Sequence, residues 1–310
     1  MKNKNAALMV VALAAVAAAS LFVGSAGGFD PEIVLRLRLP RVILGVLVGG
    51  ALASSGAVYQ NILRNPLADP YILGSASGAA LGVAMAEAFG ARYMAPLFSF
   101  VFSFAATAFV FAAANGFGRG VSASPSSGRL ILVGVAVNVF ISGAIILFYY
   151  VSARDAHTLV MFLFGNLQEN NPRLIAVAAL ASAPCIWLLV KSAPSLDTFA
   201  LGEEKSATIG TNVAGRRLAA AALVSVLTGV SVSLAGVIGF VGLVAPHAAR
   251  IFVGPSLKKL IPSAFVVGAI YLVISDAAAR SLFAPVELPV GVVSAILGAP
   301  YFIYILSRGE

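Results

Sequence analysis

The chain has 310 residues and a formal net charge of +8; 60% of its residues are hydrophobic, only 10% are charged, and its mean hydropathy is +0.99. A water-soluble domain carries about 25% charged residues, so this composition excludes a soluble fold and predicts a membrane protein. The positive charge is that of residues flanking membrane spans, because nucleic-acid binding would need a clustered basic face interleaved with aromatic residues.

Long apolar runs predict helices that cross the membrane, since a spanning helix needs roughly 20 apolar residues and satisfies its own backbone hydrogen bonds. A transmembrane β-barrel would show short alternating segments instead. The run 217–253 is too long for one helix and contains several glycines, so it predicts two short spans and brings the total to about ten. In chain order the runs lie near 6–26, 42–62, 71–90, 94–115, 130–151, 174–190, 217–253, 260–283 and 288–306.

The first run could be a signal peptide, but its apolar stretch of about twenty residues is long for one, and we favour a retained first helix. With the amino terminus in the cytoplasm, ten spans place most of the 20 lysines and arginines on the cytoplasmic side, including every lysine, as the positive-inside rule requires. Both termini are then cytoplasmic. An outside cluster, Arg36, Arg38 and Arg41, departs from the rule and needs another explanation.

Glycines at intervals of four predict close contacts between helices, because small faces let membrane helices approach. They are Gly45 and Gly49 in one span and Gly74, Gly78 and Gly82 in the next. We assign them packing and no substrate role.

Two polar segments interrupt the apolar pattern. Residues 191–216 form the longest predicted cytoplasmic loop, within which Leu201 to Ile209 can form a short helix that ends at Gly210, since glycine commonly follows a helix end. The other segment lies outside and predicts an amphipathic helix over about 153–165.

The sequence shows no catalytic, metal or cofactor site. It lacks the G-x-x-x-x-G-K-[ST] phosphate loop, so any ATP hydrolysis would occur on another subunit. Its two histidines, His157 and His247, lie beside no nucleophile or carboxylate at a catalytic spacing.

Asp276 and Arg280 are expected to pair on one helix face. An ion-coupled carrier would need carboxylates near the bilayer middle, which are not evident, but this class stays open as the alternative to an ATP-driven transporter.

Five blocks resemble the permease of the iron-chelate, haem and vitamin B12 class of ABC importers. The first contains Arg-Leu-Pro-Arg and Asn-Pro-Leu-Ala-Asp-Pro. In order along nearly the whole chain, the blocks are Arg38–Pro70, Leu73–Ala79, Leu201–Val213, Leu234–Arg250 and Glu287–Pro300.

This resemblance implies an all-α polytopic permease, in one membrane domain over 1–310, of the type II importer class. Such permeases work as homodimers in the inner membrane. Two ATP-binding subunits, which hold ATP and Mg, dock from the cytoplasm, and an extracytoplasmic binding protein delivers the cargo. The implied cargo is a bulky metal chelate: an iron siderophore by default, because that branch of the family is broadest, with haem and cobalamin as alternatives.

The resemblance also implies roles for particular residues. Arginines facing the binding protein would be Arg38 and Arg41, with Arg280 by position; lipid headgroup contact is the alternative reading. The coupling contact with the ATPase would involve Leu201, Gly202, Glu203, Glu204 and Gly210. A cytoplasmic gate would involve Asn65, Leu67 and Ser127, although Gly128 beside Ser127 has no side chain to close a pore. The outer mouth of the pathway would involve Arg154, Asp155 and His157.

Overall fold

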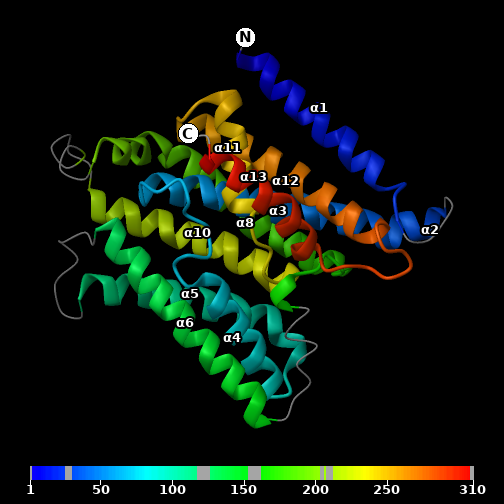
Figure 1. The fold of residues 1–310 in the computed structure, drawn as a ribbon, viewed down its shortest axis with the longest axis horizontal. Coiled ribbons are helices and arrows are strands. Elements are labelled where there is room, and N and C mark those ends of the chain that lie inside the picture. The colour runs from blue at the N-terminus through cyan, green and yellow to red at the C-terminus, as the bar shows by residue number, and fades with distance from the viewer. Residues whose placement is uncertain are drawn as a thin grey trace.

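Ten helices of 13 residues or more, together with a few short turns of helix, make up the part of the chain that the computed structural model describes, residues 2–24, 30–116, 126–152, 162–202, 206 and 212–307. No strand occurs in these residues. The ten correspond one to one to the ten predicted spans, and Figure 1 shows them as one bundle. They are α1 (Lys2–Ser20), α3 (Leu39–Ile62), α4 (Ser75–Ala88), α5 (Ala95–Asn115), α6 (Ser127–Ser152), α8 (Pro172–Asp197), α10 (Val213–Ala235), α11 (Val241–Val253), α12 (Leu257–Ser281) and α13 (Val290–Ser307).

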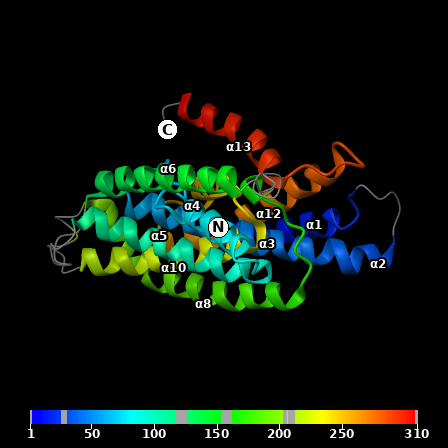
Figure 2. The same cartoon turned by 90° about the horizontal axis from the view of Figure 1, so that it is seen from below.

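Among the residues that the structure describes, six helical segments are long and apolar enough to cross a membrane by length and composition, and three further apolar helices are shorter. The six are Pro31–Ile62, Ala95–Asn115, Ser127–Val151, Pro172–Ala200, Val213–Ala235 and Leu257–Ser281. The first of them includes α2 (Pro31–Ile33) and a π-helical turn (Val34–Arg38), which join α3 without a break. Figure 2 shows α13 along one edge of the bundle and α8 along the opposite edge.

Helix α3 lies at the centre of the bundle, where it packs against α8, α10, α11 and α12. Its core side chains, such as Leu52 and Tyr59, are almost fully buried. Glycines make this packing possible: a Cβ at Gly49 would collide with the carbonyl of Gly268 in α12, and one at Gly56 with the carbonyl of Gly242 in α11. The predicted close approach of helices through small residues is therefore confirmed at Gly49.

The run 217–253 divides into two helices, as predicted. Helix α10 ends at Ala235, and α11 begins at Val241. Between them Gly236 adopts a φ of +70°, a conformation that glycine reaches at no steric cost. The break exposes backbone groups of the intervening residues, and Tyr71 satisfies two of them: its hydroxyl lies 3.2 Å from the carbonyl oxygen of Ile238 and 3.3 Å from the amide nitrogen.

Helix α4 begins at Ser75, later than the apolar run 71–90 suggests, because residues 63–74 join α3 to α4 without forming a long helix, and residues 68–74 of this segment are buried or half-buried. Irregular backbone is tolerated at membrane depth only where other groups satisfy it. The amide of Asn138 on α6 donates to the carbonyls of Tyr71 (3.3 Å) and Ile72 (3.4 Å), and the hydroxyl of Ser77 donates to Asn138 Oδ1 (2.6 Å). This polar link holds the segment between α3 and α6.

The predicted loop 191–216 is shorter in the structure, because α8 extends to Asp197 and α10 already begins at Val213. The polar sequence after Lys191 suggested a loop. It nevertheless continues the buried face of α8, since Ala193 and Leu196 are fully buried on the same side as Leu189. An apolar stripe at helical spacing is enough to keep such a segment helical.

Candidate functional site

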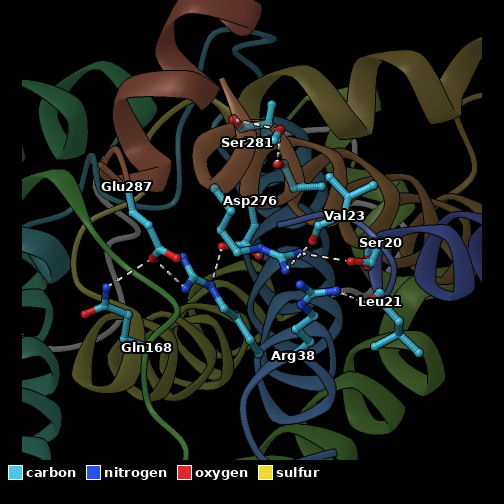
Figure 3. A network of polar contacts seen from close by, with 12 residues as sticks. Ser20, Leu21, Val23, Arg38, Gln168, Asp276, Ser281 and Glu287 are labelled. Atoms are coloured by element: carbon cyan, nitrogen blue, oxygen red, sulfur yellow. Dashed lines mark hydrogen bonds and ion pairs between the residues drawn. The ribbon is translucent and has the colours of Figure 1, made fainter. Parts of the chain in front are cut away.

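Four charged residues from distant parts of the chain form an ion network at the end of the bundle that is predicted to lie outside (Figure 3). Arg41 on α3 donates from Nε to Asp276 Oδ1 at 2.8 Å and from Nη1 to Glu287 Oε2 at 2.9 Å. Arg280 Nε lies 2.9 Å from Asp276 Oδ2, one turn along α12. The expected pairing of Asp276 with Arg280 is therefore present, and Arg41 extends it to a second helix and to the loop before α13.

Two arginines of this region hold the end of α1. Arg38 Nη1 donates to the carbonyl of Leu21 at 2.8 Å, and Arg280 donates to the carbonyls of Val23 at 2.9 Å and Ser20 at 3.3 Å. The last carbonyls of a helix have no partner within the helix, and cations are favoured there by the helix dipole. Arg38, Arg41, Asp276, Arg280 and Glu287 are called the arginine cluster below.

The arginine cluster is mostly buried. Arg38 and Arg280 are 5% and 3% exposed, and the side chains of Asp276 and Glu287 are 3% and 29% exposed. By contrast, Arg36 pairs with Glu32 at 3.3 Å with both side chains largely in the open. Beside the cluster is a cavity of about 420 Å³, lined by Arg38, Arg41, Arg280, Glu287 and neighbouring residues. The three arginines predicted to face a binding protein thus converge on one cavity, and their docking role stays a prediction.

Sequence reasoning gave no role to two members of this site, Glu287 and Gln168. Gln168 Nε2 donates to Glu287 Oε2 at 3.4 Å. Burial would raise the pKa of Glu287, but the hydrogen bond from Arg41 and the charge of that arginine hold it below its usual value. Glu287 is therefore a carboxylate at neutral pH. The sequence did contain one signal for Glu287: it is a single acidic residue in a predicted outer loop, and the predicted outer arginines would lie on the same side.

At the opposite end, a short 3-10 helix, Thr198–Leu201, follows α8 and ends at Gly202, whose φ of +103° suits only glycine. Ser206 folds back onto it: its hydroxyl lies 2.6 Å from the carbonyl oxygen of Gly202 and 2.7 Å from that of Thr198. Of the residues predicted to contact an ATPase, Leu201 and Gly202 belong to this turn. Glu203, Glu204 and Gly210 lie outside the described residues.

Two side chains fasten this turn to the helix bundle. Asp197 accepts hydrogen bonds from the amide of Leu257 at 2.9 Å and the hydroxyl of Ser256 at 3.0 Å, and so caps the start of α12. Arg217 in the first turns of α10 is 1% exposed, and its guanidinium lies 5.8 Å from the centre of the Phe199 ring. Its Nη2 donates to the carbonyl of Ile62, at the end of α3, at 3.3 Å. The turn is therefore connected to α3, α10 and α12.

The predicted gate residues occupy two separate elements. Asn65 follows α3, and its side chain accepts a hydrogen bond from the amide of Leu67 at 2.9 Å, which fixes a turn. Leu67 is 42% exposed. Ser127 is the first residue of α6, and within the described part of the chain no hydrogen bond joins it to the Asn65 turn. The gate role remains a prediction.

The predicted outer mouth, Arg154, Asp155 and His157, lies outside the described residues. So does most of the predicted amphipathic helix over about 153–165, of which the structure describes only the last residues. These form a short helical stretch up to Phe164 and then a turn at Gly165, whose φ is +65°.

Residues 5–308 match the FecCD transport family. A similar protein, the hemin transport system permease protein HmuU of Yersinia pestis, is 37% identical over 285 residues, which cover 89% of this chain and 84% of that protein. The cobalamin import system permease protein BtuC of Halobacterium salinarum is also 37% identical, over 90% of this chain and 74% of that protein. A solved metal-chelate type ABC transporter in an inward-facing conformation is 30% identical, with a TM-score of 0.86 over 97% of both chains.

Proposed function

Because the chain belongs to the FecCD transport family, we propose that it is the permease subunit of an ATP-driven importer that carries a metal chelate by alternating access. The family match over residues 5–308 carries this proposal. Ten helices in the arrangement of a metal-chelate type ABC transporter support it. Transport through this chain would involve no covalent intermediate, since ATP and Mg would be held by a separate subunit.

The proposed assembly contains two copies of this chain, two ATP-binding subunits and an extracytoplasmic binding protein, in the inner membrane with both termini cytoplasmic. An even number of helices supports the placement of both termini on one side. Long exposed apolar faces on α6 and α13 suit contact with lipid or with the second copy; Phe140 and Ile303, for example, are 78% and 66% exposed.

The proposed cargo is an iron siderophore, with haem and cobalamin as the alternatives. The haemin and cobalamin relatives are equally similar to this chain, at 37% identity, so overall similarity does not favour either. The siderophore is preferred because that branch of the family is broadest.

We expect ATP-dependent uptake of one cargo by proteoliposomes that contain this chain with its proposed ATPase subunit and binding protein. Ferric siderophore, haem and cobalamin are offered in parallel, and accumulated metal is measured with ATP and with a non-hydrolysable analogue. Uptake that needs an ion gradient and no ATP would contradict the importer and support the ion-coupled carrier. ATP-dependent uptake of haem or cobalamin alone would contradict only the siderophore assignment.

The cavity beside the arginine cluster is the proposed docking site for an acidic side chain of the binding protein. Arg38, Arg41 and Arg280 converge on it, and their opposing carboxylates are Asp276, which is buried, and Glu287, which is partly exposed. Glu287 shares the cavity with the incoming carboxylate and would repel it. Charges at such a rim act mainly on the association rate.

Glu287→Gln is therefore expected to strengthen docking, which is the opposite of what damage to the fold would do. Removing one negative charge at the cavity should tighten binding of the binding protein roughly fivefold at low salt, with a smaller gain at high salt. The measurement is surface plasmon resonance on the purified permease complex. Glu32→Gln makes the same change of net charge outside the cavity and should leave affinity nearly unchanged. Weaker or unaltered docking of the Glu287 variant would rule out this cavity.

For the cytoplasmic end we propose that the turn at Leu201 and Gly202, with Glu203, Glu204 and Gly210, contacts the ATPase. The hydrogen bonds of Ser206 and the cation–π contact of Arg217 with Phe199 support a rigid contact at this place. Asn65, Leu67 and Ser127 are proposed as the gate, and Arg154, Asp155 and His157 as the outer mouth, on the family resemblance alone.

A further inference from the structure

Helix α1 is held to the bundle unevenly. Its last residue, Ser20, and the turn that follows it accept hydrogen bonds from Arg38 and Arg280, and along its length α1 packs mainly against α12. Figure 1 shows it running along the edge of the bundle beside α12. Towards its start it covers little, and Leu8 and Val11 are 69% and 64% exposed. The carboxyl-terminal end of α1 is thus held to the bundle by hydrogen bonds, whereas its amino-terminal half leaves apolar side chains exposed.

Between the first half of α1 and the hairpin of α11 and α12 is a groove of about 740 Å³. Its walls are apolar, and Lys258 and Lys259 line its end at the start of α12. We call this space the α1–α12 groove. Its apolar wall residues are Met9, Val10, Phe252, Val253, Pro262 and Val266.

The charge around the α1–α12 groove is positive. Both lysines are exposed, and among the described residues no carboxylate forms an ion pair with either of them. Asp197 contacts the start of α12, but its two carboxylate oxygens already accept hydrogen bonds from the hydroxyl of Ser256 and from the amide of Leu257. An anion at the mouth of the groove would therefore meet two ammonium groups without a competing acid.

We propose that the α1–α12 groove binds an anionic phospholipid, with an acyl chain between α1 and α12 and the phosphate at Lys258 and Lys259. In a membrane-spanning chain an apolar groove of this kind faces hydrocarbon, and only a lipid combines an apolar chain with a phosphate at the right depth. Basic pockets between membrane helices on the cytoplasmic side bind acidic headgroups in this way. The inference requires that the start of α12 is cytoplasmic, as in the proposed function, but it does not depend on the cargo or on docking.

Lipid binding to the purified full-length protein tests the proposal. Phosphatidylglycerol and phosphatidylcholine with identical acyl chains are titrated into the protein in detergent, and bound lipid is counted by native mass spectrometry. We expect preferential binding of phosphatidylglycerol. Lys258→Gln with Lys259→Gln should weaken it on the order of twentyfold, from about fivefold per lysine. Lys191→Gln is the matched control, because Lys191 lies over the Trp187 ring on α8, and should change binding less than twofold.

A second variant tests the acyl-chain part without altering charge. Val10→Trp places a large side chain in the α1–α12 groove from an exposed position (57%), so the fold should tolerate it while binding of phosphatidylglycerol falls. Glycerol phosphate, which lacks acyl chains, should not compete. Equal binding of the two lipids, unchanged binding by the double lysine variant, or full competition by glycerol phosphate would each overturn the proposal.

Discussion

Asp276→Asn is expected to destabilise the protein by about 3–5 kcal/mol, the usual cost of breaking a buried ion pair from one side. Asp276 is the only residue of the arginine cluster that pairs with two arginines, Arg41 at 2.8 Å and Arg280 at 2.9 Å. Both arginines are largely buried, so water reaching them through the cavity would replace only part of the lost interaction. The variant leaves Glu287 as the one carboxylate facing them.

The measurement is resistance to unfolding in detergent, by temperature or by titration with a denaturing detergent. Glu32→Gln is the matched control, because its partner Arg36 is also four residues away in a helical segment but both side chains are mostly exposed. Such pairs contribute about 0–1 kcal/mol. A double variant, Asp276→Asn with Arg280→Gln, removes one of the unbalanced charges and should recover part of the loss. Equal stability of the Asp276 and Glu32 variants would show that the arginine cluster does not stabilise the fold.

Arg217→Gln is expected to lower ATP-driven uptake at least about tenfold while ATP hydrolysis continues. Arg217 is a positioning residue: its guanidinium lies over the Phe199 ring in the proposed ATPase contact and donates to the carbonyl of Ile62 at the end of α3. Residues 63–67, which include the proposed gate residues Asn65 and Leu67, follow directly. Motion of the turn could therefore reach the gate through one side chain. A hydrogen bond from a charged group contributes about 1.5–3 kcal/mol, enough for a tenfold change.

The readout that separates positioning from folding is the number of cargo molecules transported per ATP hydrolysed, with uptake and hydrolysis measured on the same proteoliposomes. Arg216→Gln is the control: the adjacent arginine is exposed, and its replacement should leave this ratio unchanged. Arg217→Lys keeps the charge but loses the planar guanidinium and its fixed donor geometry, so an intermediate ratio is expected. If uptake and hydrolysis fall together, in step with the amount of assembled complex, Arg217 only stabilises the protein.

The sequence by itself determined that the protein lies in lipid and that it has about ten helices. Lipid cannot satisfy backbone groups, so each apolar run must be helical, and glycines at 236 and 239 divide the longest run. It also grouped Arg38, Arg41 and Arg280 as predicted outer arginines and paired Asp276 with Arg280, because motif, charge bias and helical spacing are local properties. The family followed from the order of five local blocks.

The tertiary structure decided what these residues contact. Arg41 meets Asp276 and Glu287 across 235 and 246 positions of sequence, where α3 packs closely against α12 through Gly49. The helical extension of α8 to Asp197 and the irregular path of residues 68–74 were missed for the same reason. Buried contacts with Leu196 and hydrogen bonds from Asn138 override a polar or irregular local sequence, and such contacts come from distant segments that only the packed bundle brings together.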